Sequence, residues 1–341
     1  MRVAIVGATG QVGTVMRAIV RERNFPVDEI RFFSSVRSAG TTLHWNGRDV
    51  VVEDAATADF SGIQIALVSS GAVSSRELSP RMAAAGAIVI DNSSAWRMDP
   101  DVPLVVSEVN AHTLHSIPKG IVANPNCTTM AAMPILKPLH VAAGLRSITV
   151  STYQAVSGAG REGVDELAGQ LEKSLGHDVR ALTFDGSTFP LDSGVKFPAT
   201  IAHNVIPIAG FIVNDGMNET GEEKKLRDES RKILEIPGLL VDATCVRVPV
   251  FTGHSMSITA SFERPISPEE ATALLEHAAG VFVCDMPMPL VAAGKDPSYV
   301  GRIRRAETVT NGLSFFVSND NLRKGAALNA VQIGEALLEI L

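Results

Sequence analysis

The feature that most constrains the fold lies near the amino terminus, where a glycine-rich turn joins a short apolar run to a helix-like segment. Residues 3–6 form the apolar run, and the loop Gly7-Ala8-Thr9-Gly10-Gln11-Val12-Gly13 follows directly. Residues 12–23 then carry apolar side chains at the spacing of one helix face. A strand, a glycine turn and a helix in this order predict that the chain opens with a parallel βαβ unit.

The same loop predicts a dinucleotide site. Its spacing, G-x-x-G-x-x-G, departs from G-x-G-x-x-G, but glycines still permit a sharp turn, and the helix amino terminus still presents unpaired N–H groups to a pyrophosphate. A purely structural turn is the alternative. The loop residues expected to bind the cofactor are Gly7, Thr9, Gly10, Gln11, Val12 and Gly13.

The residues after the second apolar run, 30–33, bear on the choice of dinucleotide. An NAD site places Asp or Glu there to bind the ribose 2′-hydroxyl, whereas this chain has Ser34-Ser35-Val36-Arg37-Ser38. Arg37 together with the hydroxyls of Ser35 and Ser38 suits a 2′-phosphate. The segment therefore predicts NADP, and a solvated loop arginine is the alternative.

Further along the chain, apolar runs and helix-like segments predict two kinds of sheet. Strands of a doubly wound parallel sheet are expected at 65–68, 87–90, 105–107 and 121–123, with a helix at 79–85. After about residue 130 the runs alternate between apolar and polar residues, which favours antiparallel strands. These are expected at 147–154, 245–251 and 255–262, with helices at 162–175, 219–234 and 268–278 and an amphipathic helix at 328–341.

Composition excludes several classes of protein. The 341 residues are 45% hydrophobic and 20% charged, which suits two folded domains rather than a disordered chain. The net charge of −7 gives no sign of a nucleic-acid partner, and no apolar stretch is long enough to predict a membrane span. Three widely spaced cysteines suggest neither a disulfide framework nor a metal site, so we expect a cytoplasmic protein without a metal.

Cys127 is the candidate nucleophile. It follows Asn124-Pro125-Asn126, residues typical of a turn, and precedes an apolar helix-like stretch. The positive end of the helix dipole is expected to lower the pKa of its thiol and favour the thiolate. The alternative is a small buried side chain, the usual role of a free cysteine, which suits Cys245 and Cys284 in their apolar runs. A thiolate beside a nicotinamide predicts attack on an activated carbonyl and hydride transfer at that carbon.

These segments, taken together and in order, resemble the bacterial aspartate-β-semialdehyde dehydrogenases over essentially the whole chain. Besides the glycine loop and Arg37-Ser38, the matching segments are DNSSAWR at 91–97, NPNCTT at 124–129, QAVSG at 154–158, EEKK at 222–225, RVPV at 247–250, Gly253-His254 and NDNLRKGAA at 319–327. The resemblance implies a glyceraldehyde-3-phosphate dehydrogenase-like architecture. Its parts are a Rossmann domain of residues 1–126, to which 321–341 return, and an α+β catalytic and dimerisation domain of residues 127–320 with a mainly antiparallel sheet.

The resemblance also implies an activity. The family reduces L-aspartyl-4-phosphate with NADPH to L-aspartate-4-semialdehyde and phosphate, in the biosynthesis of lysine, threonine, methionine and isoleucine. Cys127 would form a thioester, His254 would be the acid and base, and Gln154 would orient the thioacyl group. From the residues alone, His254 could equally be a structural histidine.

Substrate and cofactor contacts are implied in the same way. Arg247 would hold the substrate α-carboxylate, Arg97 and Lys225 the phosphate, and Glu222 the amino group, with Asn126 beside them. Glu222 and Lys225 could instead form a surface ion pair, and helix phase decides whether they or Glu223 and Lys224 face the pocket. The remaining cofactor contacts implied are Ser157 and Gly158 along the nicotinamide, with Asn321 and Gln332 closing over it.

Two alternatives remain at this point. Another acyl-phosphate reductase, such as N-acetyl-γ-glutamyl-phosphate reductase, would keep the glycine loop and Cys127 but would not need Glu222 near a free amino group. A non-catalytic NADP-binding regulator would tolerate the loss of Cys127. The resemblance further implies a homodimer built through the second domain, with small-molecule substrates as the other partners.

Overall fold

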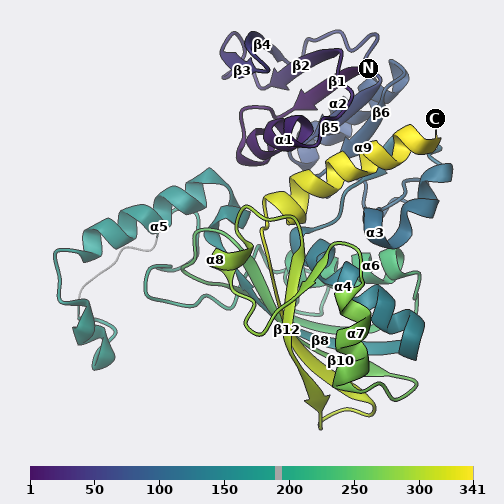
Figure 1. Cartoon of the computed structure of the whole chain (residues 1–341). Coiled ribbons are helices and arrows are strands. Elements are labelled where there is room, and N and C mark those ends of the chain that lie inside the picture. Colours follow the sequence, from purple (N-terminus) through teal and green to yellow (C-terminus); the bar gives the residue numbers. More distant parts are fainter. Residues whose placement is uncertain (189–193, 341) are drawn as a thin grey trace.

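Two β-sheets and the helices around them organise the molecule (Figure 1). The computed structural model describes residues 1–188 and 194–340. The strands of the amino-terminal sheet are β1 (Arg2–Val6), β2 (Glu29–Ser34), β3 (Thr42–Trp45), β4 (Arg48–Asp54), β5 (Ile65–Val68), β6 (Ile88–Asp91) and β7 (Ile121–Ala123). Those of the second sheet are β8 (Leu145–Gln154), β9 (Leu240–Arg247), β10 (His254–Phe262), β11 (Val281–Val283), β12 (Ser298–Ala306) and β13 (Gly312–Asn319).

Helices connect these strands. The α-helices are α1 (Gln11–Glu22), α2 (Ala72–Ala84), α3 (Ser107–Asn110), α4 (Cys127–Ala143), α5 (Arg161–Ser174), α6 (Gly221–Leu234), α7 (Pro268–Glu276), α8 (Pro289–Ala292) and α9 (Leu328–Ile340). The shorter turns are the 3-10 segments η1 (Ala111–His115), η2 (Val156–Ala159) and η3 (Val179–Thr183) and the π segment η4 (Arg323–Ala327).

The amino-terminal sheet has the strand order β3-β4-β2-β1-β5-β6-β7, and all of its pairs are parallel except the β3–β4 hairpin. The predicted doubly wound parallel sheet is thus confirmed. The order reverses at β1, because β2 lies on one side of it and β5 on the other. In such sheets ligands bind in the crevice outside the carboxyl ends of the strands at the reversal, where the glycine loop begins.

Three predictions for this sheet were incomplete or wrong. The β3–β4 hairpin was missed, although Asn46 and Gly47 both have positive φ and form the dipeptide that favours tight hairpins. The second helix begins at Ala72 rather than at residue 79. The strand expected at 105–107 is not a strand, because the Val105 N–H bonds to Ala123 at the edge of β7 and the chain then enters α3.

The second sheet has the order β11-β12-β13-β10-β8-β9. Its three central pairs are antiparallel, as predicted, whereas β8–β9 and β11–β12 are parallel. The strand expected at 245–251 is therefore wrong in extent and direction. It ends at Arg247, because Pro249 cannot donate to a strand ladder, and it runs parallel to β8 because the long connection through α5 and α6 crosses over.

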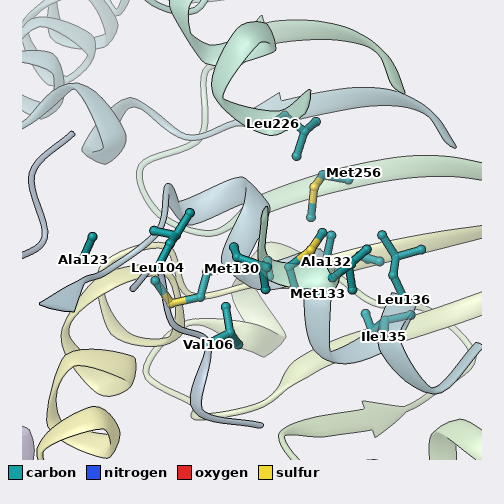
Figure 2. Close-up of a cluster of buried hydrophobic side chains, with 14 of the residues drawn as sticks. Leu104, Val106, Ala123, Met130, Ala132, Met133, Ile135, Leu136, Leu226 and Met256 are labelled. Atoms are coloured by element: carbon teal, nitrogen blue, oxygen red, sulfur yellow. The ribbon is translucent and has the colours of Figure 1, made fainter. Parts of the chain in front are cut away.

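The helix α4 packs against α6 and the second sheet, and its first residue is Cys127. Figure 2 shows Met130, Met133 and Leu136 of this helix in one apolar cluster with Leu226 of α6 and Met256 of β10. Residues 128–136 are all buried, as expected for a helix segment that is apolar on almost every side, whereas Val141 near the end of the helix is exposed. Its amino-terminal end is thereby fixed relative to both sheets.

The carboxyl-terminal helix α9 packs against the amino-terminal sheet. Its Leu328, Val331 and Ile333 share an apolar cluster with Val3 and Ile5 of β1, and Figure 1 shows it running along the boundary between the two sheets. Leu341, in the helix predicted to return, lies outside the described residues. The domain limits at 126 and 320 stay predictions.

Candidate active site

Cys127 lies just beyond the carboxyl end of β7, as the first residue of α4. Asn126 caps this helix: its side-chain oxygen accepts hydrogen bonds from the Thr128 N–H at 3.1 Å and from the Thr128 hydroxyl at 2.6 Å. Gly325 of η4 packs directly behind the cysteine, because a Cβ atom at Gly325 would lie 2.8 Å from the Cys127 Cβ. The cap and η4 together hold the sulfur in one place.

Two cavities meet at Cys127. The first, of about 320 Å³, is called the glycine-loop cavity because Gly10, Gln11 and Val12 line it. The second, of about 360 Å³, is called the Arg247 cavity, and Gln154, Glu222 and Arg247 line it. Three residues line both cavities: Asn126, Cys127 and Gly158. A ligand in either cavity therefore approaches the same sulfur.

The Glu222 carboxylate is the centre of a polar cluster in the Arg247 cavity. It accepts hydrogen bonds from Lys225 at 2.7 Å, from the Asn126 amide at 3.0 Å and from Gln154 at 3.5 Å. Burial opposes its ionisation, but the Lys225 ammonium and these hydrogen bonds hold the pKa of Glu222 at about 2. The helix phase thus turns Glu222 inward, whereas Glu223 belongs to the cap at the start of α6.

Arg247 and His254 both pack against Gly158. Arg247 is 6% exposed and donates to the Ala155 carbonyl oxygen at 2.6 Å, and the His254 Nδ1 atom accepts from the Ala155 N–H at 3.0 Å. A Cβ atom at Gly158 would lie 2.9 Å from the His254 Nε2 atom, which is buried and has no hydrogen-bond partner among the described residues. Burial, and then the Arg247 charge, lower the pKa of His254 to about 3, so the imidazole is neutral at rest.

The thiol of Cys127 is protonated at rest, which contradicts the expectation of a lowered pKa. Burial raises the pKa of Cys127 to about 12, and the Glu222 carboxylate raises it further, while Arg247, Arg97 and Lys225 act in the opposite direction. The helix dipole is therefore outweighed by desolvation and by one neighbouring negative charge.

Arg97 lines the glycine-loop cavity but is already paired. It donates to the Asn92 and Asn124 carbonyl oxygens, at 2.7 and 2.9 Å, and to the Glu229 carboxylate at 2.9 Å. Glu229 is 1% exposed and was missed by sequence analysis. Nothing in its α6 segment marks it out, because an acidic residue in a charged helix normally faces solvent.

The glycine loop has the shape that a dinucleotide requires. A side chain at Gly7, whose φ is +81°, would collide with the Ser69 carbonyl group, and one at Gly13 would collide with the Gly7 carbonyl group. Within the part of the chain that the structure describes, no side chain caps α1, and Gly10, Gln11 and Val12 at its start line the glycine-loop cavity, where unpaired N–H groups suit a pyrophosphate. Sequence analysis assigned all of these glycines to this role.

A third cavity, of about 840 Å³, lies beyond this loop and is called the Arg37 cavity. It is lined by Gly7, Thr9, Ser35, Arg37 and Ser38, and the Thr9 hydroxyl lies 2.9 Å from that of Ser34. Asp54, at the end of β4, also lines it and accepts a hydrogen bond from the Ala56 N–H at 3.1 Å. Asp54 was not predicted from the sequence, because only the β2–β4 pairing brings that strand end beside Ser34.

The two carboxyl-terminal candidates have different surroundings. Asn321 lines the glycine-loop cavity, accepts from the Gly253 N–H at 2.9 Å and bonds to Ser157, which lines the same cavity. Gln332 lines none of the three cavities and instead donates to Glu108 at 3.1 Å. The structure therefore brings Asn321 and Ser157 to the site but not Gln332.

The described residues were also compared with what a metal site and a membrane-spanning helix require. Within residues 1–188 and 194–340, no three His, Cys, Asp or Glu side chains are grouped so that they could hold a metal ion. No helix of that part of the chain combines the length and the apolarity that crossing a bilayer requires.

The chain is similar to known proteins over nearly its whole length. Residues 2–117 match the family model of the semialdehyde dehydrogenase NAD binding domain, and residues 136–324 match that of the semialdehyde dehydrogenase dimerisation domain. The aspartate-semialdehyde dehydrogenase of Streptomyces akiyoshiensis is 64% identical, over 98% of each chain. That of Mycolicibacterium smegmatis is 56% identical, over 99% of each chain.

Solved structures agree with these matches. The crystal structure of aspartate semialdehyde dehydrogenase II from Vibrio cholerae, complexed with ASA, superposes with a TM-score of 0.92 at 41% identity. The alignment covers 99% of this chain and 98% of that one. The chain is a member of the aspartate-semialdehyde dehydrogenase family.

Proposed function

We propose that the chain catalyses the reversible reductive dephosphorylation of L-aspartyl-4-phosphate to L-aspartate-4-semialdehyde and phosphate. The observation that carries this proposal is the position of Cys127 where two cavities meet. A nucleophile placed there can hold an acyl group between a substrate on the Arg247 side and a dinucleotide on the glycine-loop side. The names of the relatives indicate the same aldehyde.

NADP is the cofactor that the Arg37 cavity favours. Arg37 is exposed there beside the hydroxyls of Ser35 and Ser38, and β2 ends without a carboxylate. Asp54 lines the same cavity and could accept a hydrogen bond from a ribose hydroxyl, so a variant of Arg37 distinguishes the two dinucleotides. We expect Arg37→Ala to raise the KM for NADPH at least tenfold and to change that for NADH less than twofold; equal effects would contradict a contact with the 2′-phosphate.

The substrate binds through the polar groups of the Arg247 cavity. Arg247 presents a guanidinium fork for the α-carboxylate, and Glu222 accepts the α-ammonium. Arg97 and Lys225 bind the phosphate, each while keeping its protein carboxylate partner. Gln154, whose side chain is buried beside Glu222, orients the acyl group.

Substrate binding itself favours ionisation of Cys127. The Glu222 carboxylate raises the pKa of the thiol at rest. An ammonium group bound to Glu222 neutralises that charge, which removes one of the influences that raise the pKa of the thiol. The sulfur attacks the acyl carbon, the bond from that carbon to the phosphate oxygen breaks, and a thioester forms while the proton of the thiol leaves with the phosphate.

His254 supplies the hydrogen-bond donor that acts on the adduct in the later steps. Because its Nδ1 atom accepts from the Ala155 N–H, the neutral ring carries its proton on Nε2, the atom that lies beside Gly158. When bound, the dinucleotide supplies the hydride that reduces the thioester. Nε2–H donates a hydrogen bond to the oxyanion of the adduct, rupture of the carbon–sulfur bond releases the aldehyde and a thiolate, and a proton taken up from water restores the thiol.

The decisive experiment measures NADP reduction with aspartate semialdehyde and phosphate. We expect absorbance at the reduced nicotinamide band to depend on both substrates and to vanish in Cys127→Ala, with Cys284→Ala as the matched control that keeps activity. Turnover only with N-acetyl-γ-glutamyl phosphate, or full turnover by Cys127→Ala, would overturn the proposal.

The proposed activity also bears on the oligomeric state, the pathway and the compartment of the protein. We propose a homodimer formed through the part of the chain that matches the dimerisation domain. The product aldehyde belongs to the pathway from aspartate to lysine, threonine, methionine and isoleucine. A catalytic thiol requires a reducing compartment, which favours the cytoplasm.

A further inference from the structure

Glu229 is a buried carboxylate that none of the roles above uses. It lies on α6, four residues after Lys225 and seven after Glu222, so all three occupy one stripe of that helix. Glu222 lines the Arg247 cavity and Lys225 pairs with it, whereas Glu229 is 1% exposed and lines neither that cavity nor the glycine-loop cavity. Burying a carboxylate costs free energy unless its oxygens are fully paired, so its partners show what it holds.

The two oxygens of Glu229 bind two different parts of the site. One accepts from an Arg97 terminal nitrogen at 2.9 Å, and the other accepts from the Asn126 backbone N–H at 2.7 Å. Asn126 is the cap of α4 and directly precedes Cys127. A single carboxylate therefore links the cation that lines the glycine-loop cavity to the backbone that carries the nucleophile.

Arg97 keeps donors for a ligand in this arrangement. A guanidinium group has five N–H donors, and three of its nitrogens each bond once, to Asn92, Asn124 and Glu229. Two N–H groups are left, and the three bonds fix the plane in which they point. Arg97 lines the cavity that also contains Cys127, so these donors and the sulfur share one space.

We propose that Glu229 is a positioning residue that holds Arg97 and the amino-terminal cap of the Cys127 helix in register for the phosphate. The inference rests on the proposed function, because it takes phosphate to be the group that leaves or enters at the acyl carbon. Arg97 touches the phosphate, and Glu229 acts through Arg97 and Asn126. The carboxylate is needed because two N–H donors face it, and only a group with two acceptor oxygens satisfies both.

Glu229→Gln tests this directly. Glutamine offers one acceptor oxygen and one amide group, so either Arg97 or the Asn126 N–H loses its acceptor. In the direction that forms NADPH, we expect the KM for phosphate to rise at least tenfold. The KM for aspartate semialdehyde should change less than twofold, because Arg247 and Glu222 do not contact Glu229. A role in stability alone would not split the two constants in this way.

The matched control is Glu219→Gln. Glu219 also pairs with a largely buried arginine, Arg227, and lies just before the same helix, but Arg227 lines none of the three cavities. We expect both constants to stay within twofold of the unaltered protein. If Glu229→Gln does not fold, Glu229→Asp keeps the charge and reaches only one partner, and the KM for phosphate should still rise at least threefold.

The outcomes separate the two proposals. An unaltered protein that shows no phosphate-dependent NADP reduction would refute the proposed function. If that protein is active but its folded position-229 variants leave the KM for phosphate unchanged, or shift both constants equally, Glu229 is only a structural residue and the inference fails.

Discussion

At the scale of single residues, the cations of the site differ in how their charge is balanced. Arg97 and Lys225 each form an ion pair with a glutamate, whereas Arg247 donates to the Ala155 carbonyl oxygen. Burial lowers the pKa of Arg247, and within residues 1–188 and 194–340 no carboxylate forms an ion pair with it. A substrate carboxylate supplies that partner, which is why Arg247 is suited to bind one.

Arg247→Lys keeps the charge but loses the planar fork. We expect the KM for aspartate semialdehyde to rise by about 10- to 1000-fold, which corresponds to one to several kcal/mol of lost binding. Steady-state kinetics measure this, with Arg264→Lys as the control because Arg264 also donates to a carbonyl oxygen, that of Ala142, at an exposed position. An unchanged KM would remove Arg247 from substrate binding.

His254 makes stability depend on pH in the acid range. Its pKa is lowered to about 3 in the folded protein, so the unfolded chain binds one more proton than the folded chain between about pH 6.5 and 3. The free energy of unfolding therefore falls as pH falls through that window, by about 1.4 kcal/mol per pH unit from this group.

His254→Asn should flatten that slope by the same amount, because asparagine does not titrate. The asparagine oxygen can still accept the hydrogen bond from the Ala155 N–H. Urea unfolding at several pH values between 6 and 4 measures the slope. His115→Asn, on the exposed surface, is the control. Parallel slopes for the unaltered protein and His254→Asn would show that the imidazole is not buried as a neutral group.

At the scale of elements, the site is assembled by the ends of a few short segments. The glycine loop begins α1, Asn126 begins α4, and η2 carries Gly158 between the two cavities. The π segment η4 packs behind Cys127, and irregular turns of this kind often occur at functional sites. Segment ends serve this purpose because their backbone N–H groups and side chains are free to face a ligand.

Gly158→Ala tests the close packing of η2. The new Cβ atom would lie 2.9 Å from the His254 ring and 3.0 Å from an Arg247 nitrogen, so both side chains must move. We expect kcat to fall at least tenfold with little change in melting temperature. Gly169→Ala in α5, where a Cβ atom meets nothing within 4 Å, should keep activity and gain about 0.5–1 kcal/mol of stability. Equal activities would contradict the assigned geometry.

At the scale of the whole molecule, the second sheet has two unlike faces. One face packs against α4, α6 and α7 through residues such as Val150 and Ile258. On the opposite face, Thr149, Ser151 and Tyr153 of β8 are exposed. An exposed sheet face within the part that matches the dimerisation domain is the surface expected to meet a second copy.

Thr149→Arg should weaken that association. An arginine on an already exposed position leaves the single chain intact but places a long charged side chain in the proposed interface. Sedimentation or light scattering should show a shift from dimer toward monomer of at least tenfold in Kd. Thr42→Arg on β3, also an exposed strand position, is the control. A dimer unaffected by Thr149→Arg would place the interface elsewhere.

Short-range features were predictable from the sequence alone. The parallel βαβ opening, the glycine loop and the start of a helix at Cys127 depend on neighbouring residues, because turn geometry, capping and apolar periodicity act over a few positions. The family was recognisable for the same reason, since its motifs are short and ordered. Most of the site residues were likewise predictable from the sequence.

The tertiary structure alone decided the electrostatics of the site and the direction of β9. Glu229 lies 132 residues after Arg97, and Glu222 lies 96 residues after Asn126, so no local pattern could pair them. The raised pKa of Cys127 depends on burial and on that distant glutamate rather than on its own helix. Charge pairing and desolvation are set by which segments packing brings together, and a linear sequence does not record that proximity.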